Sequence, residues 1–506
     1  MATGEISMIR SIPAATAVLA ILSCFVGAQQ PARAQDVVTY HNTPNRHGLY
    51  AVPDLTEAAA ANIHPDTAFH ATVSGSVYAQ PLYWQPSGAK VGLLIVATES
   101  NLVYALNADT GAQVWQTQVG TPVQSGTLPC GDISPEGVTG TPVIDAASGR
   151  LYLDAMTIQP GNLPRHMIYA LSLTNGKVVP HWPLNVDNAM AVRHAAFSSE
   201  IQGERSALQF FKGRLYVNYG GRAGDCGNYH GVAIEITPST APAITGDWET
   251  RALRGGIWSQ GGAASDGSSL FVTTGNTSGA TNWGDGEAVI RLEPGLRHSF
   301  KPKDAFTPAN WQTLDNQDAD LGGTAAIPFS VPAASGPLGR ILGLGKDGHA
   351  YLLNAAELGG LGHSLANVLV SNSRIITGPA AYQTADATMV VFTNLAGLSS
   401  KCSGNSLTML KVTADAKTPI STAWCAVLNG SGAPIFTTTN GTANPIVWVA
   451  GAEGDNQLHG FNGLSGRIVF SGTGTSMTGL HRFGTLIAAN HHLYVGADGT
   501  VYAFTF

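Results

Sequence analysis

Two carboxylates stand four residues apart in a stretch of small and turn-forming residues. The stretch is CGDISPEGVTG, residues 130–140, and the carboxylates are Asp132 and Glu136. Paired carboxylates suit general-base catalysis or the binding of a hard cation. We therefore take Asp132 and Glu136 as candidate catalytic residues. The alternative interpretation is that Asp132 fastens a loop through hydrogen bonds to the nearby backbone.

A second group of candidates combines three residues that carry or can gain positive charge with one aspartate. Arg205 precedes an apolar stretch at 208–217, and Asp225, His230 and Lys346 lie in glycine-containing segments. Arginine and lysine hold acidic ligands well. Buried ion pairs within the fold would use the same residues. A lone histidine such as His230 is more often a hydrogen-bonded structural residue than a ligand.

Trp258 is the aromatic residue best placed for ligand stacking. It lies in GGIWSQGG, where glycines on both sides allow close backbone approach and expose the ring face. Such a face suits a planar ring or a sugar. Packing inside the protein is an equally good interpretation.

A third acidic stretch, DNQDADLGG, carries Asp315, Asp318 and Asp320 with the spacing of oxygen ligands. It lacks the twelve-residue loop pattern of an EF-hand. A solvated turn is the favoured interpretation.

The elements that must position these residues form a repeat. Its clearest copy is VYALNADTGAQVW at 103–115, in which an alternating strand is followed by a turn at Gly111 and a second strand with Trp115. Further copies of the strand start near 168, 232, 288, 349, 407, 458 and 501. Their mean spacing of about 57 residues is typical of a solenoid or propeller.

Another strand of similar character precedes most of these starts, as in GLLIVAT at 92 and RLYLDAM at 150. With flanking strands, each unit makes a four-stranded sheet. We predict an all-β fold, an eight-bladed β-propeller of four-stranded antiparallel sheets, as a single domain over residues 35–506. The segment DVVTY, Asp36 to Tyr40, is predicted to complete the last blade. Loops at one end of such a fold form an axial funnel suited to a small ligand.

The pattern from Ala105 to Trp115 resembles the tryptophan docking motif of the pyrroloquinoline quinone (PQQ) propellers. Most of the chain is also similar to a group of exported bacterial PQQ-binding-like repeat proteins. The matching stretches are YAQPLY at 78–83, CGDISPEGVTGTPVID at 130–145, DCGNYHG at 225–231, GGIWSQGG at 255–262, DADLGG at 318–323 and GKDGHAYLLN at 345–354. The resemblance implies that Trp115 packs between blades.

In the dehydrogenases of that superfamily, PQQ lies in the funnel against a calcium or lanthanide ion, and an aspartate removes the alcohol proton. The segment TTGNTS at 273–278 resembles the one whose asparagine binds the ion, which implies a metal-binding role for Asn276. The resemblance also implies PQQ and calcium as cofactors. From their residue types and positions, we take Arg205, His230, Trp258 and Lys346 as candidate cofactor-binding residues. The chain has no adjacent Cys-Cys pair of the kind on which PQQ stacks in many of those enzymes.

Composition and the first residues indicate an exported protein. An apolar run from Ala14 to Ala28 and the small-residue site before Gln35 are typical of a signal peptide over residues 1–34, which places the chain in the periplasm or outside the cell. Four cysteines then remain, an even number that suggests two disulfides. Cys402 with Cys425 would close a hairpin-sized loop, leaving Cys130 with Cys226, although the sequence does not fix the pairing.

Three functions follow from these patterns. The first is a propeller that binds a small molecule or sugar in its funnel, as a quinoprotein dehydrogenase of alcohols or sugars. The second is a non-catalytic propeller that binds protein or carbohydrate in the cell envelope, which the missing Cys-Cys pair favours. The third is a lyase or hydrolase using funnel carboxylates. With 12% charged residues and a net charge of −7, the chain has no basic field to gather phosphates, which argues against a nucleic-acid partner. No later segment is long and apolar enough to span a membrane.

Overall fold

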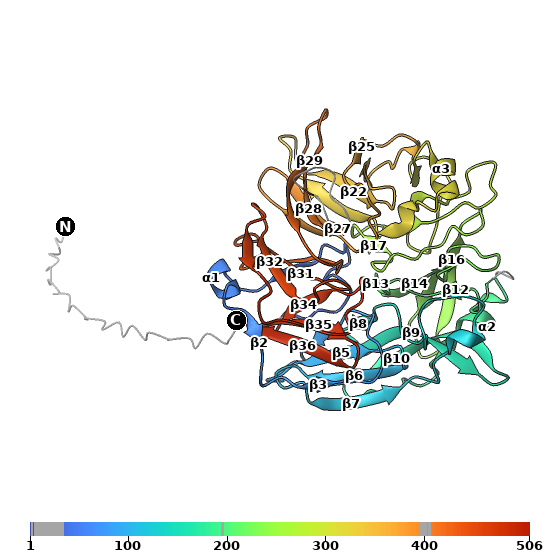
Figure 1. Cartoon of the computed structure of the whole chain (residues 1–506), viewed down its shortest axis with the longest axis horizontal. Helices are drawn as coiled ribbons and strands as arrows, with labels where there is room; N and C mark the ends of the chain where they lie inside the picture. Colours follow the sequence, from blue (N-terminus) through green and yellow to red (C-terminus); the bar gives the residue numbers. More distant parts are fainter. Residues whose placement is uncertain (2–3, 5–34, 194–196, 395–401, 403–405) are drawn as a thin grey trace. The chain divides into compact units, whose positions relative to one another are not determined.

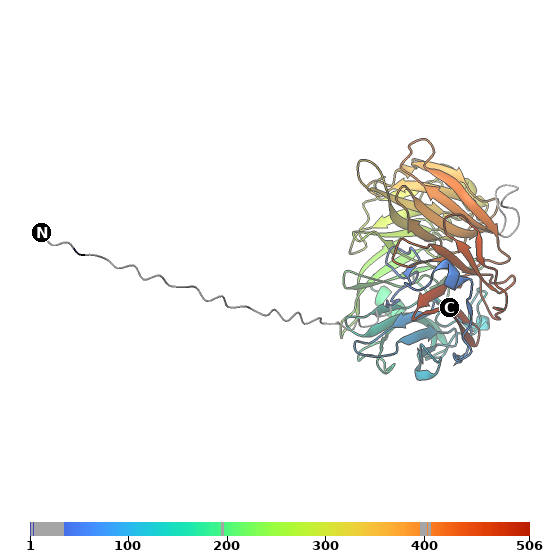
Figure 2. The ribbon, with the colours of Figure 1, turned by 90° about the vertical axis from the view of Figure 1, so that its left-hand side faces the viewer.

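The computed structural model describes residues 1, 4, 35–193, 197–394, 402 and 406–506. The predicted signal peptide lies almost entirely outside these residues. Within them the chain forms eight small sheets arranged around a common centre (Figure 1). The fold is an eight-bladed β-propeller, as predicted. Figure 2 shows the same sheets after a turn of 90°.

The blades follow one another along the chain. The first three contain β4 (Leu82–Trp84), β5 (Leu93–Ala97), β6 (Leu102–Asn107) and β7 (Gln113–Gln118); β8 (Val143–Asp145), β9 (Arg150–Gln159), β10 (Leu163–Ser172) and β11 (Leu184–Asn185); and β12 (Gln202–Gly203), β13 (Gln209–Phe211), β14 (Arg214–Gly221), β15 (Val232–Thr237) and β16 (Ala243–Glu249).

The next three blades contain β17 (Ala264–Ser265), β18 (Leu270–Thr274), β19 (Ala288–Leu292), β20 (Ala305–Thr307) and β24 (Gly360–Leu361); β21 (Ile327–Val331), β22 (Leu338–Leu344), β23 (His349–Asn354) and β25 (Ala366–Leu369); and β26 (Ala380–Gln383), β27 (Thr388–Asn394), β28 (Ser406–Val412) and β29 (Ile420–Val427).

The last two blades contain β1 (Leu49–Ala51), β30 (Ile435–Thr438), β31 (Ile446–Ala450), β32 (Leu458–Asn462) and β33 (Ile468–Phe470); and β34 (Leu486–Ala489), β35 (His492–Ala497), β36 (Thr500–Thr505), β2 (His64–Pro65) and β3 (Ala71–Thr72).

The helices are α1 (Glu57–Ala60), α2 (Val186–Met190) and α3 (Trp311–Asn316), with short 3-10 turns at Ser125–Thr127 and Leu321–Gly323. No helix in the described part of the chain is long and apolar enough to cross a membrane.

Four of these sheets have five strands rather than the predicted four. The extra strands are short and come from loops or from the N-terminal region, and two of them, β1 and β24, pair in parallel. They carry no alternating apolar pattern long enough to be recognised. The sequence repeat therefore predicted the four strands that the blades share but not these additional strands.

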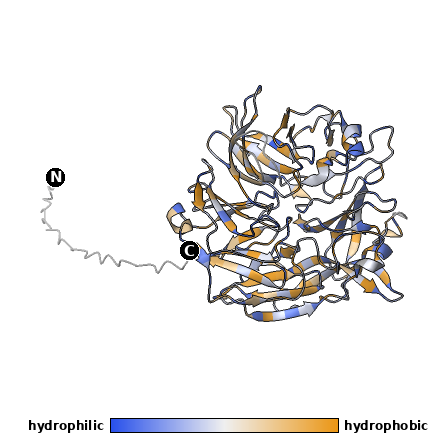
Figure 3. Cartoon of the chain, in the orientation of Figure 1, coloured by the Kyte–Doolittle hydropathy of each residue, from blue (hydrophilic) through white to orange (hydrophobic). Residues whose placement is uncertain are grey.

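Burial explains the composition of the strands. A central strand such as β5 is covered on both faces by neighbouring blades, and four of its five residues are buried. Its sequence is therefore continuously apolar. The outer strand β7 alternates instead, with Trp115 buried between exposed Val114 and Gln116. Figure 3 shows hydrophobic residues concentrated in the strands.

Trp115 joins the first blade to the second. Its indole nitrogen donates to the carbonyl oxygen of Leu173 at 2.9 Å. Gly176 lies under the ring, where a Cβ atom would come within 2.5 Å of the indole. Only glycine leaves room for this contact, and its φ of +70° also requires glycine. The structure thus confirms the packing role predicted for Trp115.

The prediction for Asp36 to Tyr40 is wrong. Within this segment Val37 pairs with Tyr83 of β4, whereas the last blade is completed by β2 and β3, which pair with β36. The alternation that suggested a strand instead buries Val37 and Tyr40 near the propeller axis.

Residues 38–48 fill the centre of the propeller and form what we call the axial plug. Its backbone oxygens accept hydrogen bonds of 2.7–2.8 Å from the innermost strands of four blades; the donors are the amides of Ile144, Ser265, Ala381 and Phe436. The guanidinium of Arg46, which is 1% exposed, donates to the carbonyl oxygens of Leu208, Ala263 and Tyr40 and to the hydroxyl of Thr39. The plug therefore ties distant blades to one another.

Both predicted disulfides are present. Cys130 bonds to Cys226 and links the loop before β8 to the loop between β14 and β15. Cys402 bonds to Cys425 in β29. The first of these lies beside the candidate site.

Candidate functional site

Four of the predicted site residues line one pocket of about 190 Å³. Arg205 precedes β13, Trp258 precedes β17, Asn276 follows β18, and Lys346 follows β22. They come from three consecutive blades, and the pocket walls also include Asp225, Tyr229, Arg254, Asp318 and Asp320. We call this space the funnel pocket. Residues far apart in sequence meet here because the blades are arranged radially, so that loops of neighbouring blades lie side by side near the axis.

Lys346 is the centre of the charge arrangement. Its ammonium lies 2.5 Å from a carboxylate oxygen of Asp320, 3.3 Å from Asp318 and 5.1 Å from the ring centre of Trp258. Burial disfavours the charge on Lys346, but the two carboxylates outweigh burial and raise its pKa. Lys346 is therefore a fixed cation against the Trp258 ring.

Asp320 is the buried carboxylate of the pocket. Its side chain is 6% exposed, and burial, opposed by Lys346, raises its pKa to about 6. One oxygen pairs with Lys346, whereas Oδ1 has no hydrogen-bond partner among the described residues. Gly275 permits this arrangement, because a Cβ atom there would lie 3.2 Å from both Asp320 Oδ1 and Trp258 Nε1.

The solvated turn favoured for DNQDADLGG is wrong for Asp320. Asp318 is exposed, as expected for a residue in a solvated turn. Asp315 accepts a hydrogen bond from the amide of Thr277 at 2.8 Å. Asp320 is instead buried against Lys346. Sequence spacing could not reveal this burial, because Lys346 lies 26 residues further along the chain, after β22 of the blade that Asp320 precedes.

Asn276 presents a second unsatisfied oxygen. Its Oδ1 is buried and has no hydrogen-bond partner within the described part of the chain. An oxygen of this kind suits a cation or a ligand donor. The described residues nevertheless contain no group of three His, Cys, Asp or Glu side chains arranged to hold a metal ion.

Asp132 and Glu136 pair with different arginines. They line a smaller pocket of about 20 Å³ that shares Arg205 and Arg222 with the funnel pocket. Glu136 is buried in an ion pair with Arg222, whose guanidinium also donates to the backbone oxygens of Ser199 and Gln202. Asp132 is 68% exposed and lies 3.6 Å from Arg205. These contacts favour a structural role for Glu136.

Arg205 and His230 have different surroundings. Arg205 lies at the junction of the two pockets, with its guanidinium 5.3 Å from the ring centre of Phe483. His230 does not line the funnel pocket. Its Nδ1 lies 2.6 Å from the carbonyl oxygen of Thr250, which matches the structural interpretation of a lone histidine.

Sequence reasoning missed a group of buried acids beside the smaller pocket. Glu99 and Glu204 each have one carboxylate oxygen without a partner in the described ranges, and burial raises the pKa of Glu99 to about 8. Burial also raises the pKa of Glu204, with further contributions from Asp154, Glu99 and Glu136. The sequence gave only a weak indication of these buried acids. They are single acidic residues near the ends of predicted strands, in a chain with only 12% charged residues.

Asp154 completes this group through a buried histidine. Its carboxylate lies 2.7 Å from His166 Nδ1 and accepts a hydrogen bond from the Tyr219 hydroxyl at 2.9 Å. Burial opposes the charge on His166, but Asp154 raises its pKa overall. His166 Nε2 lies 3.0 Å from the carbonyl oxygen of Gln202, so both ring nitrogens have a partner for a charged imidazole.

Residues 65–220 match the family described as outer membrane protein assembly factor BamB. The quinohemoprotein alcohol dehydrogenase from Comamonas testosteroni superposes with a TM-score of 0.64 at 15% identity, covering 93% of this chain and 80% of that one. The chain therefore has the β-propeller fold of this dehydrogenase, and residues 65–220 are similar to the BamB family.

Two further structures support this fold assignment. The quinohemoprotein alcohol dehydrogenase ADHIIG from Pseudomonas putida HK5 superposes on this chain with a TM-score of 0.62 at 10% identity, over 93% of this chain and 80% of that one. A europium-containing methanol dehydrogenase gives 0.61 at 12% identity, over 93% and 98%. At these identities the similarity concerns the fold alone. No curated protein sequence matches the chain.

Proposed function

We propose that this PQQ-like propeller is an exported quinoprotein that binds PQQ in the funnel pocket and oxidises alcohols or sugars. One observation carries the proposal: an accessible tryptophan ring, a fixed lysine and a half-satisfied buried carboxylate, from neighbouring blades, share one pocket. The names of the superposed dehydrogenases agree with it. The two disulfides support export.

The pocket residues fit a planar, multiply anionic ligand. The Trp258 ring offers a stacking face. Arg205, Arg254 and Lys346 provide positive charge in the pocket wall, which suits the carboxylates of the cofactor. The Asn276 side-chain oxygen, which lacks a partner in the described structure, provides one ligand for calcium. Calcium takes about six to eight oxygens, so the cofactor and water would supply the rest.

PQQ, when bound, supplies a quinone that accepts a hydride from the alcohol carbon. Asp320 accepts the hydroxyl proton, for which its pKa of about 6 and its free oxygen suit it better than Asp132 or Glu136. Lys346 holds the other Asp320 oxygen and so orients the carboxylate.

The test is titration of the purified protein with PQQ, with and without calcium, followed by quinone absorbance and the melting temperature. We expect binding to weaken in Trp258→Leu and Asn276→Ala. Arg374→Gln, an exposed arginine outside this pocket, is the matched control. Dye reduction with a panel of alcohols and sugars then tests the reaction. No absorbance change, no thermal shift and no dye reduction would remove the proposal.

A second candidate function is favoured by the BamB family match over residues 65–220. In this case the propeller binds a protein or carbohydrate partner in the cell envelope without catalysis. A pull-down from envelope extract separates the two functions. A binding propeller retains a specific partner and gives no dye reduction, and a dehydrogenase gives dye reduction without needing that partner.

A further inference from the structure

A second and larger pocket lies at the opposite end of the blades from the funnel pocket. The funnel pocket uses loops that join the second and third strands of a blade, such as those at Asn276 and Lys346. The second pocket uses loops that join the first and second strands, at 266–267, 330–339 and 383–388. Because successive strands run in opposite directions, these two sets of loops lie at opposite ends of the sheets.

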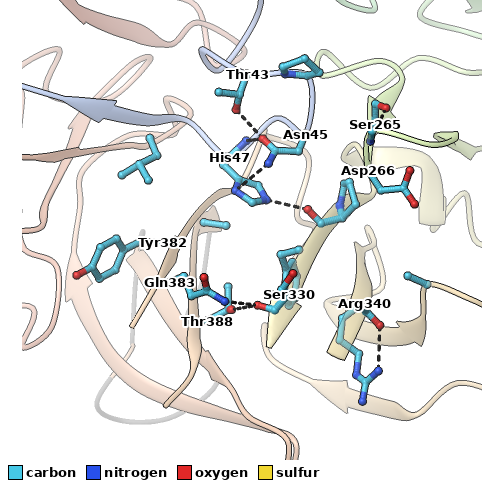
Figure 4. Close-up of a pocket in the computed structure, with 18 of the residues that line it drawn as sticks. Thr43, Asn45, His47, Ser265, Asp266, Ser330, Arg340, Tyr382, Gln383 and Thr388 are labelled. Atoms are coloured by element: carbon cyan, nitrogen blue, oxygen red, sulfur yellow. Dashed lines mark hydrogen bonds between the residues drawn. The ribbon is translucent and has the colours of Figure 1, made fainter. Parts of the chain in front are cut away.

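This second pocket has the size and walls of a small-molecule site. Its volume is about 820 Å³, within the range of roughly 300–1,000 Å³ that ligand pockets occupy. Part of the axial plug, Pro44 to His47, forms one wall, and apolar side chains from β1, β21 and β26 form much of the rest; they are Leu49, Pro328, Phe329, Ala381 and Tyr382. Figure 4 shows the polar groups set among them.

Arg340 supplies a positive charge without an acidic partner. Its guanidinium donates to the carbonyl oxygen of Gly339 at 2.9 Å, and no ion pair of Arg340 occurs among the described residues. Partial burial lowers its pKa. The acid in the pocket wall is Asp266, and one of its oxygens already accepts the amides of Ser268 and Ser269. A cation that has no ion pair among the described residues and lies in a largely apolar wall favours an anionic ligand.

The neighbouring polar side chains are held in place. Gln383 and Thr388 both donate to the carbonyl oxygen of Ser330, at 3.0 and 2.6 Å. His47 donates from Nε2 to the carbonyl oxygen of Pro328 at 2.7 Å, and burial lowers its pKa, so it is neutral and adds no charge that competes with Arg340. These contacts, drawn as dashed lines in Figure 4, fix the pocket before any ligand arrives.

We propose that this pocket binds a small organic carboxylate with an apolar body. The carboxylate pairs with Arg340, and the apolar body lies against Phe329, Tyr382 and Leu49. The site is separate from the funnel pocket and needs neither PQQ nor calcium, so it stands independently of the proposed function.

Isothermal titration of the full chain with phenylacetate tests the proposal, with neutral phenylacetamide as the matched probe. Arg340→Gln should weaken phenylacetate binding by about tenfold or more, because a hydrogen-bonded charge contributes roughly 1.5–3 kcal/mol. Ser330→Trp, which fills the pocket from an exposed position, should abolish binding. Arg374→Gln and Trp258→Leu should bind phenylacetate like the unaltered protein.

Three outcomes would overturn the inference: no phenylacetate binding to the unaltered protein, equal binding of phenylacetamide, or unchanged binding in both pocket variants. A neutral sugar that binds in place of phenylacetate would also overturn it. Trp258 lines the funnel pocket and not the second pocket. A Trp258→Leu variant that loses PQQ binding but retains phenylacetate binding would therefore support two separate sites.

Discussion

Asp320 shares its pocket with a lysine that neutralises only one of its oxygens. Because burial raises its pKa to about 6, the carboxylate is an effective base only above that pH. For the proposed dehydrogenase activity, turnover should rise as the pH increases through about 6. Asp320→Asn should lower kcat by roughly 100-fold or more while PQQ still binds. Steady-state kinetics between pH 5 and 8, with exposed Asp318→Asn as the control, provide the check.

A pH profile that stays flat in the unaltered protein, or an Asp320→Asn variant with normal kcat, would contradict this role. The comparison with Asp318→Asn is informative because both carboxylates contact Lys346 but only Asp320 is buried.

Glu99 gives a prediction about stability. Its carboxylate accepts the amide of Gly137 at 2.6 Å, and burial raises its pKa from 4.5 to about 8. A raised pKa means that the folded state binds the proton more tightly than the unfolded state, so this stabilisation is complete below pH about 4.5 and lost as the pH rises through about 8. Glu99→Gln should therefore flatten the loss of unfolding free energy over this range.

Urea denaturation at several pH values measures that slope, and exposed Glu200→Gln serves as the control. Identical slopes in Glu99→Gln and the unaltered protein would show that the carboxyl of Glu99 does not titrate as argued.

Sequence and structure agree on site residues only in part. Trp258, Asn276 and Lys346 were recognisable because glycines or a family-like motif surround them, and the structure brings them together. Asp320 was assigned to solvent, and Glu136 was taken as a base, because the partners that decide their state, Lys346 and Arg222, lie far along the chain. A sequence shows residue types and local spacing but not the partner that burial provides.

At the scale of elements, the axial plug depends on Arg46. This buried guanidinium serves four oxygen acceptors from the plug and two inner segments of the propeller. Arg46→Met keeps the volume but leaves buried carbonyl groups unpaired, and each costs roughly 1–3 kcal/mol. We expect a clear loss of unfolding free energy, measured by chemical denaturation, whereas Arg374→Met should change it by less than about 0.5 kcal/mol. Equal stability of the two variants would contradict the role of Arg46.

Strands that obey the repeat were predictable, and those that close the ring were not. β5 and β6 carry continuous apolar residues because two neighbouring blades bury them. β2 and β3 have two residues each, and one of these is Pro65, so their sequence resembles a loop. They pair with β36 only because the circular arrangement brings the two ends of the propeller together.

At the scale of the whole molecule, the two disulfides enclose very different lengths of chain. Cys130 and Cys226 are 96 residues apart, and Cys402 and Cys425 are 23 apart. Restriction of the unfolded chain increases with loop length, so the first bond should contribute more, within a range of roughly 2–5 kcal/mol. The paired serine variants, Cys130→Ser with Cys226→Ser and Cys402→Ser with Cys425→Ser, test this by their melting temperatures. A larger decrease for the second pair would contradict the expectation.

The central position of residues 38–48 has a consequence for the order of assembly. The blade amides that donate to their carbonyl oxygens are spread from Ile144 to Phe436, so these donors exist together only after most of the polypeptide has been synthesised. An early segment must therefore wait for late ones, and native contacts of such large sequence separation make folding slow. A nascent chain that stops before the seventh blade would leave this segment without the amide of Phe436, so the N-terminal residues become native only when nearly the entire protein is available.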